Sequence, residues 1–183
     1  MTTVEKVAAY MGIDVTASRD VLTSLIGSVS EAIEHYCGRE FARRSRTEIL
    51  DGRGTGTLLL SCRPIALIED VRLDARHAFG PETAIDGEGI VFYGSAGLLH
   101  WEEGVFPLGR QNVRVVYTAG YETVPPSIEQ AANMLVAHFY NRGHQGGDGV
   151  TSESIGAYSV SYNDADWPAA ARTLLNEFRE VRV

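Results

Sequence analysis

Two histidines and an aspartate lie around a glycine-rich run in the last third of the chain. His138 precedes the run, and His144 and Asp148 fall within it, in NRGHQGGDG at residues 141–149. Side chains of these types could activate a water molecule, and a glycine-rich loop could place them around a small substrate. The six-residue spacing of the two histidines excludes a metal pair on one helical face, which needs spacings of three or four, although a loop could still bring them together. We therefore keep a small intracellular hydrolase as an alternative interpretation.

A second glycine-rich stretch, DGRGTGT at residues 51–57, has the composition of a phosphate-binding turn. Such a turn needs a helix after it, whose first amides hold the anion, and a lysine at its end. The residues that follow are LLLS, which predict a strand, so we interpret the stretch as a glycine-rich hairpin. The sequence also contains no GxSxG, CxxC or HExxH motif. We find no positive signature of an enzyme and expect no catalytic residue, no cofactor and no metal site.

The chain is acidic. Its 183 residues include 16 Lys or Arg and 24 Asp or Glu, which give a formal charge of −8. A protein that grips duplex DNA needs several converging cations to displace counterions from phosphates. The densest basic cluster consists of Arg39, Arg43, Arg44 and Arg46. We expect these arginines to pair with neighbouring carboxylates, so the charge pattern argues against stable binding to nucleic acid.

Composition and cysteine usage place the chain among ordinary globular proteins. Hydrophobic residues make up 44% of the sequence, and Cys37 and Cys62 are isolated, which is typical of a reducing compartment. The N-terminus lacks the basic start and apolar run of a signal peptide, and no stretch approaches the roughly 18 apolar residues that span a bilayer. We expect a soluble protein that is made in the cytoplasm and has no membrane partner.

Apolar residues at helical spacing predict two helices at the start of the chain. Thr2 and Glu5 have the spacing of a capping box for the first, and Gly12 is placed to end it. The second covers residues 17–37, and Gly38 stands where a left-handed cap falls. These two helices form the N-terminal part of a helical core.

Two further helices are predicted near the end of the chain. A second capping box at Ser127 opens the third, and Gly143 is expected to end it. After the glycine run, apolar residues at alternate positions of 155–162 predict a strand, and Pro168 then opens the fourth helix.

The middle of the chain changes to short runs of β-forming residues separated by turn residues. These runs lie at residues 46–50, 57–61, 71–74, 90–93, 98–101 and 113–117. They predict a small antiparallel sheet of five or six strands. The fold class is therefore α+β, a helical core of four main helices with an inserted small antiparallel β-sheet subdomain. The expected division is 1–45 for the N-terminal part of the core, 46–120 for the inserted subdomain and 121–183 for the part that completes the core.

Two segments are candidates for contacts with other proteins. The last helix and tail interleave large apolar residues with arginines, a combination favoured at interfaces, although the helix could equally pack on its own core. Its candidate docking residues are Trp167, Arg172, Leu174, Phe178, Arg179 and Val183. The glycine run and the strand after it are a candidate hinge and tether that orders on assembly, or else a loose surface loop. Its candidate residues are Gly143, Gly146, Gly147, Gly149, Ser154, Ile155, Tyr158 and Tyr162.

Three segments of the chain resemble one protein family. They are EKVAAYMGID with SRDVLTSLIGSVSEAIEHYCGREF in 5–41, VRVVYTAGYETVPPSIEQAANMLVAHFYNRG in 113–143, and SESIGAYSVSYND with WPAAARTLLNEFR in 152–179. Their order and character resemble the head-to-tail connector (adaptor) proteins of tailed bacteriophages, the gp6-like and gp8-like connectors. The shared features are an aliphatic pair of N-terminal helices, a strand ending in Y-x-A-G-Y before V-P, a helix ending near Y-N-R, and a closing helix.

The resemblance implies a structural protein that forms a ring, commonly twelvefold, under the portal of a tailed phage or phage-like particle. The ring would bridge the portal protein and a tail-completion or stopper protein while DNA passes through its bore. The family's helical core would correspond to residues 4–37 and 127–142, and its portal-facing part to 165–183. The protein would then lie in the virion neck, after a stay in the host cytoplasm before assembly. The acidic charge fits a bore that repels phosphates, so that DNA slides through it.

Overall fold

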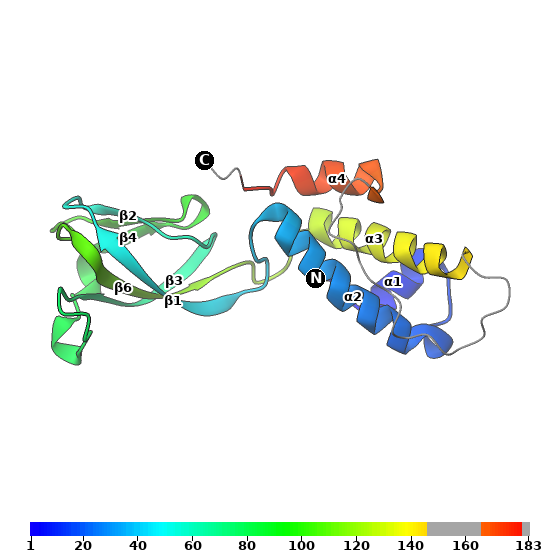
Figure 1. The fold of residues 1–183 in the computed structure, drawn as a ribbon, viewed down its shortest axis with the longest axis horizontal. Coiled ribbons are helices and arrows are strands. Elements are labelled where there is room, and N and C mark those ends of the chain that lie inside the picture. The colour runs from blue at the N-terminus through cyan, green and yellow to red at the C-terminus, as the bar shows by residue number, and fades with distance from the viewer. Residues whose placement is uncertain (146–165, 181–183) are drawn as a thin grey trace. The chain divides into compact units, whose positions relative to one another are not determined.

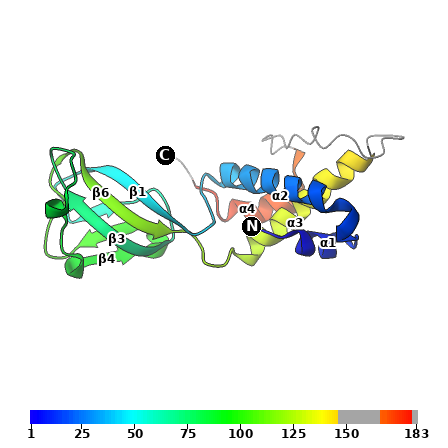
Figure 2. The ribbon, with the colours of Figure 1, turned by 90° about the horizontal axis from the view of Figure 1, so that it is seen from below.

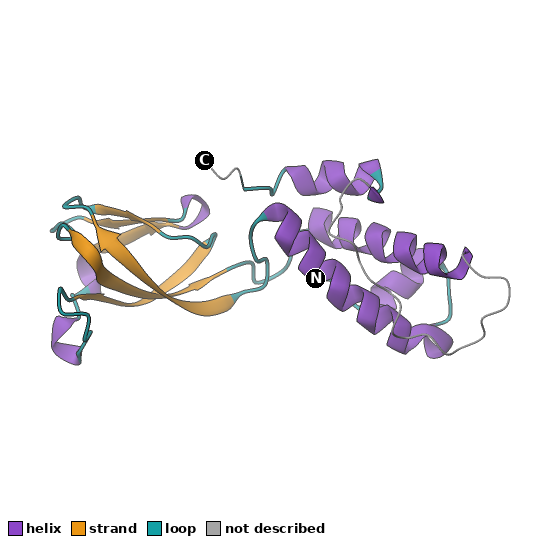
Figure 3. Ribbon diagram, viewed as in Figure 1, coloured by secondary structure: helices purple, strands orange, loops and turns teal. Residues whose placement is uncertain are grey.

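The structure is a computed structural model, and it describes residues 1–145 and 166–180. The chain divides into a helical unit, Met1–Phe41 with Thr123–Val183, and a sheet unit, Ala42–Glu122. Among the described residues, the α-helices belong to the helical unit and the strands to the sheet unit. Figure 3 colours the strands orange, and the short purple coils among them are 3-10 helices. The predicted α+β class is confirmed.

The described part of the helical unit is built from four α-helices. They are α1 (Val4–Met11), α2 (Val15–Cys37), α3 (Pro126–Gln145) and α4 (Ala169–Asn176). Helix α3 packs against the other three, and Figure 1 shows α2, α3 and α4 side by side. The core between them consists of side chains at most 1% exposed, among them Val7, Leu22, Leu25, Val29, Ile33, Ile128, Leu135 and Leu175. Burial of this apolar surface joins the beginning of the chain to its end.

The first helix begins one residue later than the predicted capping box requires. Thr3 is the N-cap of α1, and its side chain accepts a hydrogen bond from the Lys6 N–H at 3.3 Å. The prediction that Thr2 caps the helix is therefore wrong. The Thr2 hydroxyl instead donates to the side-chain carbonyl of Asn133 in α3 at 2.7 Å. This contact ties the N-terminus to a helix more than a hundred residues later.

Glycines end α1 and α2 as predicted, since Gly12 and Gly38 both have a φ of 69°, in the left-handed region. The prediction for α3 is wrong, because this helix continues through Gly143 to its last residue, Gln145. A glycine inside a helix costs about 1 kcal/mol relative to alanine, a cost that the packing of a long helix can offset. The fourth helix begins directly after Pro168, as predicted.

The sheet unit contains two three-stranded antiparallel sheets rather than the single sheet predicted. The first has the order β1-β6-β3 and the second the order β2-β5-β4. The strands are β1 (Arg44–Gly52), β2 (Thr57–Leu59), β3 (Ile65–Leu73), β4 (Ile90–Tyr93), β5 (Leu98–Trp101) and β6 (Gly109–Ala119). Figure 2 shows β6 running between β1 and β3. Both sheets contribute to one core, whose fully buried members include Leu99, Phe106, Val113, Val115 and Tyr117.

The predicted hairpin at DGRGTG is also wrong. The stretch connects β1 in the first sheet to β2 in the second, so its two flanking strands do not pair with each other. A Cβ on Gly52 would lie 1.9 Å from the backbone oxygen of Pro107. A side chain cannot fit there, so glycine lets the chain pass close to the loop before β6 as it changes sheets.

Candidate assembly surfaces

Trp167 and helix α4 pack against the C-terminal end of α2. The rings of Trp167 and Tyr36 have centroids 5.3 Å apart, and Trp167 is only 3% exposed. The Tyr36 hydroxyl donates to the side-chain carbonyl of Asn176 at 2.7 Å. The aromatic contact and the hydrogen bond are both made by Tyr36, and together they fix α4 on α2.

The residues after α4 continue along the same end of α2. Phe178 meets Phe41 edge to face, with ring centroids 6.0 Å apart. The Arg179 guanidinium lies 5.1 Å from the centre of the Tyr36 ring. The Glu180 N–H donates to the carbonyl of Cys37, the last residue of α2, at 2.8 Å. This segment therefore closes the helical unit instead of projecting from it.

The thiol of Cys37 lies under this segment and is fully buried. Burial raises its pKa to about 12, with a small opposing effect from Arg39 and Arg179. The thiolate is the nucleophile and metal ligand of cysteine chemistry. A thiol held neutral in this way acts as an apolar core residue.

The predicted docking helix is thus largely a packing element. Trp167, one of the predicted docking residues, is not exposed, because its ring completes the core of the helical unit. Leu174, Phe178 and Arg172 are partly buried, and Arg179 is exposed while stacked on Tyr36. Val183 lies outside the described residues. The exposed side of α4 itself carries small residues such as Ala169, Ala170 and Thr173.

The predicted tether lies almost wholly outside the described residues. Gly143 is exposed within α3. The remaining candidates, Gly146, Gly147, Gly149, Ser154, Ile155, Tyr158 and Tyr162, fall in 146–165, beyond what the structure describes. Their proposed role in assembly therefore rests on the sequence.

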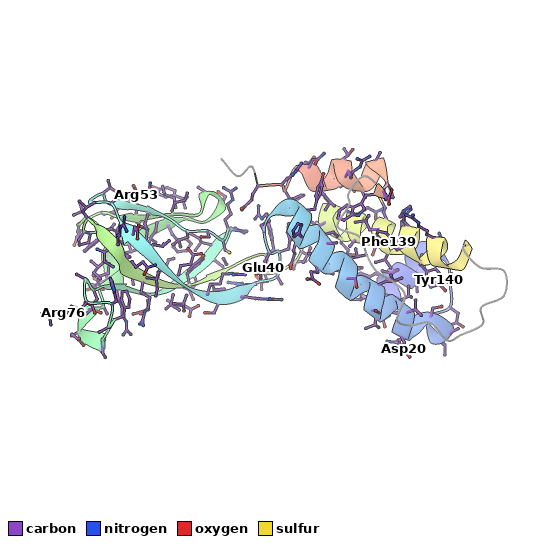
Figure 4. All side chains as sticks on the ribbon, viewed as in Figure 1. Asp20, Glu40, Arg53, Arg76, Phe139 and Tyr140 are labelled. Carbon is purple, nitrogen blue, oxygen red and sulfur yellow. The ribbon has the colours of Figure 1, made fainter. Side chains whose placement is uncertain are left out.

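The hydrolase interpretation gains no support from the described residues. His138 lies in α3 and packs its ring edge to face on Phe139, with centroids 5.3 Å apart. Figure 4 labels Phe139 and Tyr140 on this helix, and Tyr140 shares a 2.8 Å hydrogen bond with Ser18 of α2. Among the side chains that the structure describes, no group of three or more His, Cys, Asp or Glu is placed to hold a metal ion. Asp148 and the side chain of His144 are not among them.

One expected ion pair of the arginine cluster is present, since Arg43 lies 3.5 Å from the Glu122 carboxylate. Both side chains are largely exposed, so the pair stabilises the fold little.

Sequence reasoning missed a polar network in the sheet unit. The hydroxyl of the buried Tyr117 in β6 donates to the Glu48 carboxylate in β1 at 2.5 Å. The same carboxylate accepts from the Ser61 N–H at 3.1 Å, and the Tyr117 oxygen accepts from the Cys62 N–H at 3.2 Å. Burial and the nearby Glu48 raise the pKa of Tyr117 far above its usual value. The network fixes the turn before β3 to two strands of the first sheet.

Sequence reasoning also missed an exposed apolar loop before β6. Leu108 is 83% exposed and Val105 54% exposed, whereas Phe106 between them is fully buried. The sequence EGVFPLGR reads as a turn because of its glycines and proline. The signal that could have revealed a surface is three large apolar residues in one short loop.

Among the described residues, no helix is both long and apolar enough to cross a membrane.

Comparisons with known proteins point to one class. The family model described as head completion protein (HCP) matches residues 1–181. No curated protein sequence matches the chain significantly.

Solved structures with a similar fold come from gene transfer agent (GTA) particles. A chain from the neck of an empty GTA particle, computed with C6 symmetry, gives a TM-score of 0.65 at 22% identity, over 98% of this chain and 90% of that chain. A chain from the neck of the native GTA particle, computed with C12 symmetry, gives 0.59 at 22% identity, over 92% and 89%. A chain from the virion of the native particle gives 0.57 at 22% identity, over 89% and 78%. At this identity the likeness establishes a shared fold.

Proposed function

The chain belongs to the head completion protein family and is a structural head-to-tail adaptor, and from this premise we propose that twelve copies form a ring in the neck of a tailed phage or phage-like particle. The family match, which extends over residues 1–181, is the observation that carries the proposal. The ring joins the capsid to the tail and leaves an axial passage for DNA.

The twelvefold ring is supported by the similar structures. Two of them come from the necks of GTA particles, one computed with C6 and the other with C12 symmetry. Closed rings require contacts between two different surfaces of the same chain, repeated by a rotation that closes. A ring of twelve subunits also matches a sixfold description, because a twelvefold axis contains a sixfold one.

The charge of the chain suits a passage for DNA. Twelve copies at −8 each sum to about −96. A negative bore repels phosphates, so duplex DNA is neither condensed on the ring nor held in it. Passage of DNA is in this proposal transient and independent of sequence.

Two protein partners are proposed, one at each end of the ring. A portal protein lies on the capsid side, and a tail-completion or stopper protein on the other. We assign the portal side to residues 165–183, as the resemblance implied, but to the exposed surface of this segment alone. Trp167 and Phe178 hold this segment on the helical unit, and the exposed surface that they position makes the contact. Before assembly the subunit resides in the host cytoplasm.

The test is reconstitution of tail joining. DNA-filled heads that lack this protein are mixed with purified tails, with or without the purified chain, and tailed particles are counted by electron microscopy. We expect tailed particles only where the chain is added, with the number rising until every head carries a full ring. Equal numbers with and without the chain would overturn the proposal.

A further inference from the structure

The sheet unit carries most of the exposed large apolar side chains of the described residues. Those at least 36% exposed in this unit are Ile49, Leu59, Leu67, Val91, Phe92, Tyr93, Val105 and Leu108, whereas Tyr10 is the one in the helical unit. Clusters of such residues mark contact surfaces, while single ones are ordinary. Two clusters differ in the charges that surround them.

The first cluster is the loop before β6, which holds Val105 and Leu108 in a fixed position. Phe106 anchors the loop in the core, where it packs on Trp101 with ring centroids 5.8 Å apart. Two backbone hydrogen bonds tie it to the preceding crossover, from Gly54 N–H to the Phe106 carbonyl at 2.8 Å and from Phe106 N–H to the Thr55 carbonyl at 2.9 Å. A loop fixed in this way loses little conformational freedom on binding.

A buried asparagine braces the same loop. Asn112 is 5% exposed, and its side chain donates to the Pro107 carbonyl at 2.9 Å and accepts from the Gly52 N–H at 2.8 Å. The exposed leucine therefore projects from a rigid support, since Pro107 directly precedes Leu108.

Two exposed arginines flank this leucine. Arg110 follows Leu108 by two residues, and Arg53 directly precedes Gly54, where a Cβ would lie 3.8 Å from the Cβ of Leu108. Figure 4 shows Arg53 on the crossover after β1. Within the described residues neither arginine forms an ion pair. We call Arg53, Val105, Leu108 and Arg110 the loop surface.

The second cluster lies on β4, the last strand of the second sheet. Val91, Phe92 and Tyr93 are 37%, 36% and 53% exposed. A short edge strand with apolar side chains is a ready contact site for another chain.

Carboxylates gather at the beginning of β4. Glu88 directly precedes Gly89, whose carbonyl accepts from the Glu102 N–H at 2.9 Å. A Cβ on Gly89 would lie 3.6 Å from the Glu103 side chain. Glu88, Glu102 and Glu103 are all exposed. We call these three residues with Val91, Phe92 and Tyr93 the β4 surface.

We propose that the loop surface of one subunit docks on the β4 surface of the next subunit in the ring. Leu108 would supply the apolar anchor, and Arg53 and Arg110 would face the carboxylates beside β4. Each chain carries both surfaces, and they differ, so the contact is heterologous and can close into a ring. The inference rests on the proposed ring and identifies the residues that form it.

The apolar residues favour this occupant over duplex DNA. Phosphate sites use cations and polar groups, whereas an aliphatic side chain that is 83% exposed gains nothing from a phosphate backbone. A second copy of the chain can supply a surface complementary to the two arginines, because the chain carries more carboxylates than cationic side chains.

Charge reversal tests the proposal with two variants of the full chain. One variant carries Arg53→Glu and Arg110→Glu, and the other carries Glu88→Arg and Glu102→Arg. Sedimentation velocity over rising concentration, in about 50 mM salt to limit screening, measures self-association. We expect each variant to associate about tenfold more weakly than the natural sequence, because its two surfaces now repel each other.

An equimolar mixture of the two variants is the decisive sample. Each surface of one variant then meets an oppositely charged surface of the other, so we expect association to recover to that of the natural sequence. Circular dichroism of each variant controls for folding. Leu108→Ser should weaken association, whereas Leu67→Ser, which removes a leucine from outside both surfaces, should not.

Three outcomes would overturn the proposal. They are a mixture that associates as weakly as its components, a natural chain that stays monomeric up to about 1 mM, and binding of a short DNA duplex that the arginine reversals abolish. If the chain still joins tails to heads, any of these outcomes would overturn the docking proposal and leave the adaptor function intact. Failure of tail joining by the natural chain would instead overturn the adaptor function itself.

Discussion

The indole ring of Trp167 lies against the phenol ring of Tyr36, with centroids 5.3 Å apart and planes inclined by 40°. Tyr36 belongs to the last turn of α2, and Trp167 comes just before α4. The contact closes the helical unit with a segment from the end of the chain. An interface built on this part of the chain must therefore use the outer surface of residues 166–180, because their aromatic side chains already pack on the helical unit.

Substitution of Trp167 by alanine should destabilise the protein strongly. Removing a buried tryptophan costs about 3–5 kcal/mol in the free energy of unfolding, because the cavity cannot fully collapse. Urea unfolding measures this loss. Arg179→Ala is the matched control, since it removes only the exposed cation above the same tyrosine ring and should cost about 0.5–1 kcal/mol. A loss below about 1 kcal/mol for Trp167→Ala would mean that the ring is an exposed anchor after all.

Tyr117→Phe should destabilise the sheet unit by about 1–3 kcal/mol. The lost hydroxyl donates to Glu48 and accepts from the Cys62 N–H, so its removal leaves two partly buried polar groups without this partner. Thermal or urea unfolding would measure the change. Tyr93→Phe removes a hydroxyl from a half-exposed ring and should leave stability unchanged. Equal effects of the two substitutions would contradict the network.

Asp74 should contribute stability that depends on pH. Its carboxylate accepts hydrogen bonds from the backbone N–H groups of Arg76, Ala78 and Phe79, at 2.8, 2.9 and 2.8 Å. These bonds, the one from Arg76 most of all, hold its pKa below the usual value. A carboxyl whose pKa is lowered on folding stabilises the fold above its unfolded pKa of about 3.9 and loses that effect as the pH falls through the folded value.

The expected result is a loss of stability for Asp74→Asn at neutral pH that shrinks as the pH falls below about 4. Urea unfolding at several pH values measures it. Asp20→Asn, on the exposed side of α2, controls for the loss of one surface charge. A difference from the natural sequence that stays constant down to about pH 3 would show that the loop does not depend on the ionised carboxylate.

Deletion of residues 146–150 should spare folding and abolish ring assembly. The proposed tether needs the length and glycine content of this run, whereas the described helices α1 to α4 pack without it. Circular dichroism and the yield of tailed particles are the two readouts. Replacement of the same five residues by a Gly/Ser sequence of equal length is the control and should support assembly. A normal particle yield from the deletion would eliminate the tether.

The elements that the sequence predicted best are those with local signals. Gly38 ends α2 where predicted, because a left-handed cap depends on residues next to it in sequence. The start of β3 was missed: the strand begins at Ile65, six residues before the predicted one. Register shifts between Ile65 and Leu67 and between Ile68 and Asp70 interrupt the alternation of apolar and polar residues on which a strand is recognised.

The packing of the candidate docking residues has a tertiary cause. Interleaved aromatics and arginines have the same pattern in a docking helix and in a helix that closes its own core. Trp167 and Phe178 pack because Tyr36 and Phe41 lie opposite them, and sequence spacing does not contain that information. The division of the strands into two sheets is likewise set by long-range pairing, since β1 pairs with β6 and not with β2.

The most direct test of the central claim is the number of copies that bind at the neck. Tailless heads that carry the portal but lack this protein are saturated with the purified chain, and bound copies per head are measured by quantitative mass spectrometry against the portal. We expect saturation at twelve copies per portal vertex, the number in the proposed ring, which the neck computed with C12 symmetry supports. Binding that never saturates at a fixed number, or no binding to these heads at any concentration, would contradict the ring adaptor.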